Sequence, residues 1–230
     1  KHILSKSTFI KGLQCNKALY YHKHRRDLKD ALSASQEAIF AQGSSVGELA
    51  CELFPNGVDC TPESYFNFQK AVLKTEEEIK KGTKIIYEAA FQYNGVLAAL
   101  DILVKHSDGW RAYEVKSSTS VSETYEIDAS IQYYCITNSG IDLKDISIIH
   151  INNKYVKNGP IDVHQLFTTV SVLEKVENHL AKIPNQVSHL KTVLNQKNEP
   201  LIDIGPHCNT PYQCDFSSHC WKHVPKNSIF

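Results

Sequence analysis

Three carboxylates and one ammonium lie within one stretch of the chain, and a group of this composition is typical of a divalent-metal site. They are Glu88, Asp101, Glu114 and Lys116. Asp101 stands in the nearly continuous apolar run VLAALDILV, and an unpaired Asp is a poor strand former that is costly to bury. A row of solvent-facing polar residues on a half-buried sheet would give a similar alternation. The apolar neighbours of Asp101 favour the metal site.

Two turn pairs predict that these side chains meet. Asn94-Gly95 and Asp108-Gly109 take positive φ at low cost, and β-branched and aromatic residues flank both, which indicates three strands joined by two hairpins. A two-residue loop at the first pair places Glu88 opposite Asp101. A two-residue loop at the second places Asp101 opposite Lys116, with the remaining carboxylate two residues away on the same face. Because opposed Cβ atoms lie roughly 5 Å apart, we expect one charged patch.

The same residues carry a resemblance to a known family. Glu88, then Asp101, then Glu114-Val115-Lys116, followed by Gln132 on a predicted helix, resembles the PD-(D/E)xK nucleases of the RecB type. The resemblance implies a restriction-endonuclease-like core and a DNA exonuclease that hydrolyses phosphodiester bonds at single-stranded ends. Asp101, Glu114 and Glu88 would then hold Mg2+ or Mn2+. Lys116 would position the attacking water or neutralise developing charge, and Gln132 would orient the substrate or Lys116.

Two positions depart from the family pattern. Relatives place a metal-binding His on an early helix as Gly-x-x-x-His, and the matching segment here begins at Gly43 and has Gly47 in place of the His. Glu48 is the residue that could compensate as a metal ligand. Relatives also carry a Tyr four residues after the Gln, where this chain has Ile136. Without a replacement ligand, we expect activity that is weak or confined to Mn2+.

A second candidate metal centre lies in the cysteines. Cys208, Cys214 and Cys220 are separated by five residues each in a loop-rich stretch with prolines, and three thiolates are one ligand short of an iron-sulfur cluster or structural zinc. Cys15 could supply the fourth. The resemblance implies the same set, because the iron-sulfur branch, which includes CRISPR-associated exonucleases and AddB-type nucleases, binds a 4Fe-4S cluster through one N-terminal and three C-terminal cysteines. Zinc stays open as the alternative, since two histidines could also act as ligands: His207 and His219. The other cysteines are expected to be small buried hydrophobes: Cys51, Cys60 and Cys135.

The elements that must position these residues follow from periodicity and caps. Helices are expected over residues 7–21, 35–53, 61–81, 123–137, 162–182 and 184–194, with a further strand over 146–151. Thr61 and Pro62 would begin the third helix and Gly82 would end it. This order predicts an α/β sandwich in which helices flank one mixed sheet. We expect a single nuclease domain over residues 1–230, with a core of about 35–195 and a cysteine-rich cluster lobe formed by 1–25 and 200–222.

Composition restricts the remaining possibilities. The chain of 230 residues has a formal net charge of zero, so it offers no overall basic surface for phosphate. Tyr20, Tyr21 and the basic run that ends at Arg26 are a candidate for part of a single-strand groove. No segment is apolar enough to cross a membrane, and we expect a cytoplasmic protein that binds DNA. The lack of Met and the apolar end suggest a fragment of a longer protein with a further domain. Two alternatives stay open: a catalytically silent nucleic-acid-binding module and a zinc-stapled interaction domain.

Overall fold

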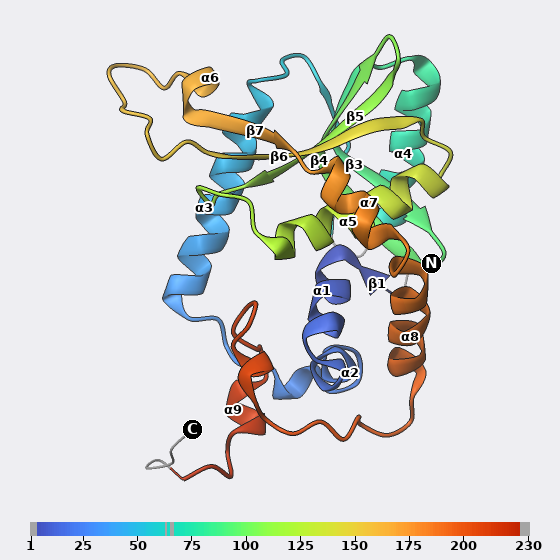
Figure 1. The fold of residues 1–230 in the computed structure, drawn as a ribbon, viewed down its shortest axis with the longest axis vertical. Helices are drawn as coiled ribbons and strands as arrows, with labels where there is room; N and C mark the ends of the chain where they lie inside the picture. Colours follow the sequence, from blue (N-terminus) through green and yellow to red (C-terminus); the bar gives the residue numbers. More distant parts are fainter. Residues whose placement is uncertain (1–3, 63, 65–66, 226–230) are drawn as a thin grey trace.

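One mixed β-sheet forms the centre of the molecule (Figure 1). The computed structural model describes residues 4–62, 64 and 67–225. Six strands run in the order β2-β3-β4-β5-β6-β7, and β1 pairs with β4 off this path. The pairs β1–β4, β2–β3 and β5–β6 are parallel and the others are antiparallel, which confirms the expected mixed sheet. The strands are β1 (Leu4–Ser5), β2 (Val58–Asp59), β3 (Ile85–Tyr93), β4 (Val96–His106), β5 (Gly109–Lys116), β6 (Leu143–Ile151) and β7 (Phe167–Ser171).

Helices cover both faces of this sheet, as expected. Buried side chains of α5 and α7 pack with one set of strand residues, while Val46 and Ala50 of α3 pack with another set that includes Ile102 and Ile149. Apolar area is thereby removed from water on both sides of the central strands. The helices are α1 (Lys6–Gln14), α2 (Asn16–His24), α3 (Ala34–Cys51), α4 (Phe68–Lys81), α5 (Glu123–Asn138), α6 (Val163–Leu166), α7 (Leu173–Leu180), α8 (Ile183–Asn195) and α9 (Ser217–Cys220), with the 3-10 turns η1 (Arg26–Leu28) and η2 (Pro206–Cys208).

The first hairpin forms in the expected register, and the second is displaced. Tyr93 pairs with Val96 across Asn94-Gly95, which confirms the first loop. His106 pairs with Gly109, so the second loop is Ser107-Asp108 and the expectation that Asp101 lies opposite Lys116 is wrong. Gly109 is the first residue of β5. The position favours glycine, because a Cβ there would lie 2.8 Å from the carbonyl oxygen of Asp142 at a φ of +150°. The displacement is two residues, so the charged side chains still share one face.

Three expected helices differ in the structure. The first divides into α1 and α2 at Cys15, whose extended backbone (φ −159°, ψ 114°) interrupts the helix. The third begins at Phe68 instead of residue 61, while Gly82 ends it as expected. The helix expected over 162–182 is α6, β7 and α7, because the β-branched run from Thr168 to Val170 pairs with β6. Pro184 lies in the first turn of α8, where its missing N–H costs nothing.

The helices α1 and α2 and the C-terminal segment that contains α9 lie on the same side of the sheet (Figure 1). The amide of Gln14, at the end of α1, donates to the carbonyl oxygens of His207 and Tyr212 at 2.7 Å each. Lys11 of the same helix pairs with Asp215 at 2.7 Å. These contacts bring α1 against the cysteine-containing C-terminal segment. Within the described ranges, no helix has the length and apolarity that crossing a membrane requires.

Candidate active site

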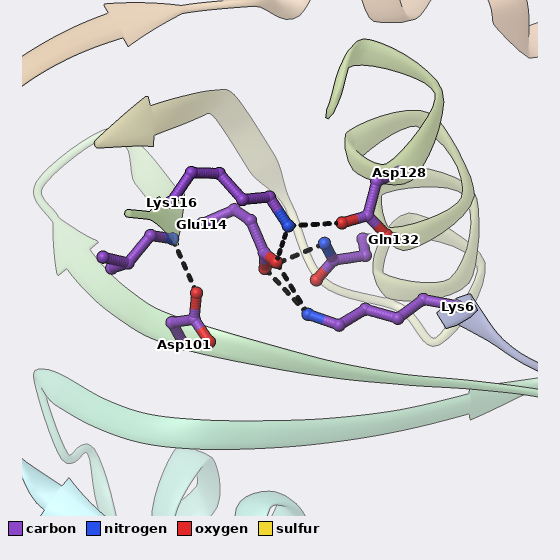
Figure 2. A network of polar contacts seen from close by, with 7 residues as sticks. Lys6, Asp101, Glu114, Lys116, Asp128 and Gln132 are labelled. Atoms are coloured by element: carbon purple, nitrogen blue, oxygen red, sulfur yellow. Dashed lines mark hydrogen bonds and ion pairs between the residues drawn. The ribbon is translucent and has the colours of Figure 1, made fainter. Parts of the chain in front are cut away.

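Glu114, near the end of β5, is the centre of a polar network (Figure 2). Its carboxylate is 2% exposed and accepts hydrogen bonds from three side chains. Lys6 Nζ lies 2.8 Å from Oε1 and 3.0 Å from Oε2. Lys116 Nζ lies 2.7 Å from Oε1, and Gln132 Nε2 lies 2.9 Å from Oε2. Burial alone would raise the pKa of Glu114, but Lys116 and Lys6 lower it to about 2, so the group is ionised at neutral pH.

Asp101 lies across from Glu114 on β4. The β4–β5 register pairs Ile102 with Tyr113, which places Asp101 directly opposite Glu114. Its Oδ2 accepts a hydrogen bond of 2.6 Å from the backbone N–H of Val115. Burial and the neighbouring charge of Glu114 raise the pKa of Asp101 to about 7. The charge of Lys6 opposes this shift only in part, and a bound cation would further favour the ionised form of Asp101.

Lys116 bridges β5 and the helix α5. Besides Glu114, its ammonium contacts Asp128 Oδ2 at 2.7 Å and lies 5.2 Å from the centre of the Tyr125 ring. Burial lowers the pKa of Lys116, but the two carboxylates outweigh it, so the pKa is well above its usual value. The lysine thus stays charged and is held in one place from both sides, which suits a group that stabilises anionic charge.

Two members of this network were missed in the sequence. Asp128 precedes Gln132 by one helical turn on α5, so the spacing that brings Gln132 to the site also brings Asp128 there. This spacing could therefore have predicted Asp128 as a member of the site. Lys6 is separated from Glu114 by 108 residues, and no local pattern connects them. Ser5 caps α1 through a reciprocal pair of hydrogen bonds with Thr8, and β1 fixes this segment beside β4.

The remaining predicted ligands lie at the margin of the network. Glu88 falls opposite Asp101 as expected, since Tyr87 pairs with Ile102 and Ala89 with Leu100, but it has a left-handed φ of 52° and breaks the ladder. Burial raises its pKa, and the charge of Lys6 opposes that shift. Glu48 is exposed on α3, and its role as a ligand stays a prediction.

The donor set fits a divalent cation, although a cation-binding geometry is not yet formed. In the described residues, no three His, Cys, Asp or Glu side chains are arranged to hold a metal ion. Carboxylate oxygens of Asp101 and Glu114 are the ligands that Mg2+ and Mn2+ prefer. The buried Oε1 of Gln132 has no hydrogen-bond partner, so a polar or cationic group near it would satisfy an otherwise unpaired acceptor.

The four candidate cluster cysteines line one cavity of about 190 Å³. The break at Cys15 places that residue in the wall of this cavity together with residues of the C-terminal segment, and His207 and His219 line it as well. Burial raises the pKa of Cys214 to about 11 and also raises that of Cys220, and a bound metal would reverse this preference for the thiol. Thiol and imidazole donors fit either an iron-sulfur cluster or zinc. Cys60 and Cys135 are buried as expected, and Cys51 is partly buried.

The segment considered for a single-strand groove is used for internal contacts. Tyr21 is 2% exposed, and its hydroxyl donates to Glu199 at 2.7 Å. Tyr20 donates to the carbonyl of Lys197, and Lys23 to that of Leu194. Tyr21 is therefore unable to stack on a base, and we withdraw it as a nucleic-acid contact.

Comparisons with known proteins leave the family open. No family model matches this chain, and no curated protein does. The match with the crystal structure of SSO0001 covers 79% of this chain and 76% of the SSO0001 chain, with a TM-score of 0.35 and 10% sequence identity. The match with the crystal structure of a phage-related exonuclease from Haemophilus somnus 129PT covers 84% of this chain and 96% of the exonuclease chain, with a TM-score of 0.30 and 11% sequence identity. Similarity at these TM-scores does not establish a family for this chain.

Proposed function

We propose that this protein is a metal-dependent deoxyribonuclease of the RecB-like PD-(D/E)xK type. The observation that supports it is the meeting of Asp101, Lys116 and Gln132 around the carboxylate of Glu114. Three of these residues come from one hairpin and the fourth from the following helix. A surface polar row would leave such side chains hydrated, whereas here Glu114 and Gln132 are buried.

Each side chain has a distinct part in the proposed reaction. Asp101, Glu114 and Glu88, with Glu48 as a further ligand, would hold Mg2+ or Mn2+. When bound, that metal polarises the phosphate and lowers the pKa of the attacking water. Lys116 presents a fixed ammonium to anionic oxygen, and Gln132 holds the Glu114 carboxylate in orientation. We propose single-stranded DNA ends as the substrate.

We further propose that Cys15, Cys208, Cys214 and Cys220 bind a 4Fe-4S cluster, with zinc as the alternative. Their presence in the wall of one cavity supports a shared ligand group. Visible absorbance and metal analysis of anaerobically purified protein distinguish the two: a brown protein containing iron supports the cluster, and a colourless one with a single zinc supports the alternative.

The test of the proposed function is cleavage of end-labelled single-stranded DNA with Mg2+ or Mn2+. Asp101→Ala and Glu114→Ala should each abolish cleavage, and the product ladder gives the direction of digestion. Asp108→Ala is the matched control, because Asp108 lies on the loop of the same hairpin and pairs with Arg111 at 2.9 Å. Bound but uncleaved DNA with the unsubstituted protein would contradict the nuclease and favour the silent binding module.

A further inference from the structure

The structure places a built-in cation at the candidate metal site. Lys6 is the first residue of α1, and its ammonium spans both oxygens of Glu114 at 2.8 and 3.0 Å. The side chain is 26% exposed, so water reaches part of it. The Ser5 cap and the pairing of β1 with β4 hold its backbone. This contact is therefore a fixed part of the fold and differs from a mobile surface pair.

Lys6 differs from the other two donors to Glu114 in what else it faces. Lys116 also binds Asp128, and Gln132 is neutral. Lys6 interacts electrostatically with Asp128 and, in addition, with Asp101 and Glu88. Figure 2 shows Lys6 and Asp101 on one side of the Glu114 carboxylate, with Lys116 and Asp128 on the other. The positive charge of the Lys6 ammonium thus interacts with all three carboxylates proposed as metal ligands, which are Glu114, Asp101 and Glu88.

Both oxygens of Glu114 already accept two hydrogen bonds each. Oε1 accepts from Lys6 and Lys116, and Oε2 from Lys6 and Gln132. A carboxylate oxygen offers about two lone-pair directions, so a metal ion gains an oxygen of Glu114 only if a donor leaves. Lys6 is the donor whose departure frees a position on both oxygens at once.

We propose that Lys6 holds the cation position of this site in the metal-free protein and that a divalent cation binds by displacing its ammonium. The inference rests on the metal site of the proposed function. Lys6 thereby sets the metal concentration that the site requires, since each binding event must first break the Lys6–Glu114 ion pair.

Calorimetric titration of Mn2+ without DNA tests this directly. Lys6→Met keeps the length of the side chain and removes its charge, and it should lower the Kd for Mn2+ about 10-fold, because the competing charge is gone. Lys6→Arg should retain the affinity of the unsubstituted protein or weaken it. Lys11→Met is the matched control on the same helix, since Lys11 pairs with Asp215, and its Kd should not change. An unchanged or higher Kd in Lys6→Met would overturn the proposal.

A second measurement needs no variant. Acylation of lysines followed by mass spectrometry should label Lys6 more rapidly when Mn2+ is present, with Lys11 as the internal reference. Equal labelling with and without Mn2+ would overturn displacement. Absence of Mn2+ binding in both the unsubstituted protein and Lys6→Met would overturn the metal site itself. Mn2+ binding with the expected Lys6 effect but no DNA cleavage would contradict only the nuclease.

Discussion

At the scale of single residues, the carboxyl groups of Glu114 and Asp101 have pKa values shifted in opposite directions. Glu114 has Lys6 and Lys116, and its pKa is lowered to about 2. Asp101 accepts a hydrogen bond from a backbone N–H, and burial and the charge of Glu114 raise its pKa to about 7 although Lys6 opposes the shift. Such opposed shifts in neighbouring acids are common at functional sites. They also make the two residues respond differently to substitution.

Asp101→Asn should stabilise the metal-free protein at alkaline pH. The pKa of Asp101 is higher in the folded protein, about 7, than in the unfolded chain, so the fold favours its neutral form. Wild-type stability is therefore lost as pH rises from about 4 through 7, and Asn avoids that loss. Denaturant unfolding in EDTA should show Asp101→Asn more stable by about 1–3 kcal/mol at pH 8 and nearly equal at pH 4. Equal differences at both pH values would contradict the assignment.

Asp128→Asn should slow DNA cleavage without changing Mn2+ affinity. Asp128 contacts Lys116 at 2.7 Å, so the variant leaves the ammonium with one carboxylate instead of two. Loss of a residue that positions a functional group typically costs about 10–100-fold in activity. Single-turnover rates and calorimetric Kd values, measured on the same preparation, separate the two effects. A parallel loss of metal affinity would show that Asp128 acts on the metal ligands instead.

At the scale of elements, local signals were sufficient where the residues lie close in the chain. Asn94-Gly95 fixes the first hairpin because both residues take positive φ there. Asp108-Gly109 gave a wrong prediction of the second loop, because Gly109 is required by the close approach of its backbone to Asp142 and not by a turn. Asp101, Glu114 and Gln132 meet because a hairpin and the next helix bring them together. Lys6 and β7 depend on distant partners, so no nearby residues could have revealed them.

The α3 helix offers a test of the histidine that the RecB-like pattern has where this chain has Gly47. Gly47 precedes Cys51 by one turn, and the charges of Asp101 and Glu88 act on the Cys51 thiol. A Cβ at Gly47 would meet nothing within 4 Å, so a His fits there. Gly47→His should tighten Mn2+ binding and increase cleavage, each about 10-fold, by adding an imidazole ligand.

Gly43→His is the matched control for this change. Gly43 lies one further turn from Cys51 on the same helix and also has open space around its Cβ. Both substitutions improve helix propensity equally, so we expect the same gain in stability from each. Only Gly47→His should gain affinity for Mn2+. Equal affinities in the two variants would place the metal away from this face of α3.

At the scale of the whole molecule, the cysteine cavity joins the two ends of the chain. Cys214→Ser should remove bound iron or zinc and lower the thermal midpoint by about 5 °C or more, because a structural metal contributes several kcal/mol to folding. Cys51→Ser is the control, as Cys51 does not line the cavity. Metal analysis and thermal unfolding under nitrogen give both quantities. An unchanged thermal midpoint in Cys214→Ser would show that a metal in this cavity does not stabilise the fold.

The helix α1 connects the two candidate metal centres physically. Its nine residues extend about 14 Å, with Lys6 at the first position and Cys15 directly after the last. A preparation that loses its sulfur-bound metal to air would loosen the far end of this helix while the sheet stays folded. Lys6 would keep its contact with Glu114, because the Ser5 cap and the pairing of β1 with β4 hold the other end of the helix. The affinity of the carboxylates for Mn2+ should therefore be the same in fresh and in air-exposed protein.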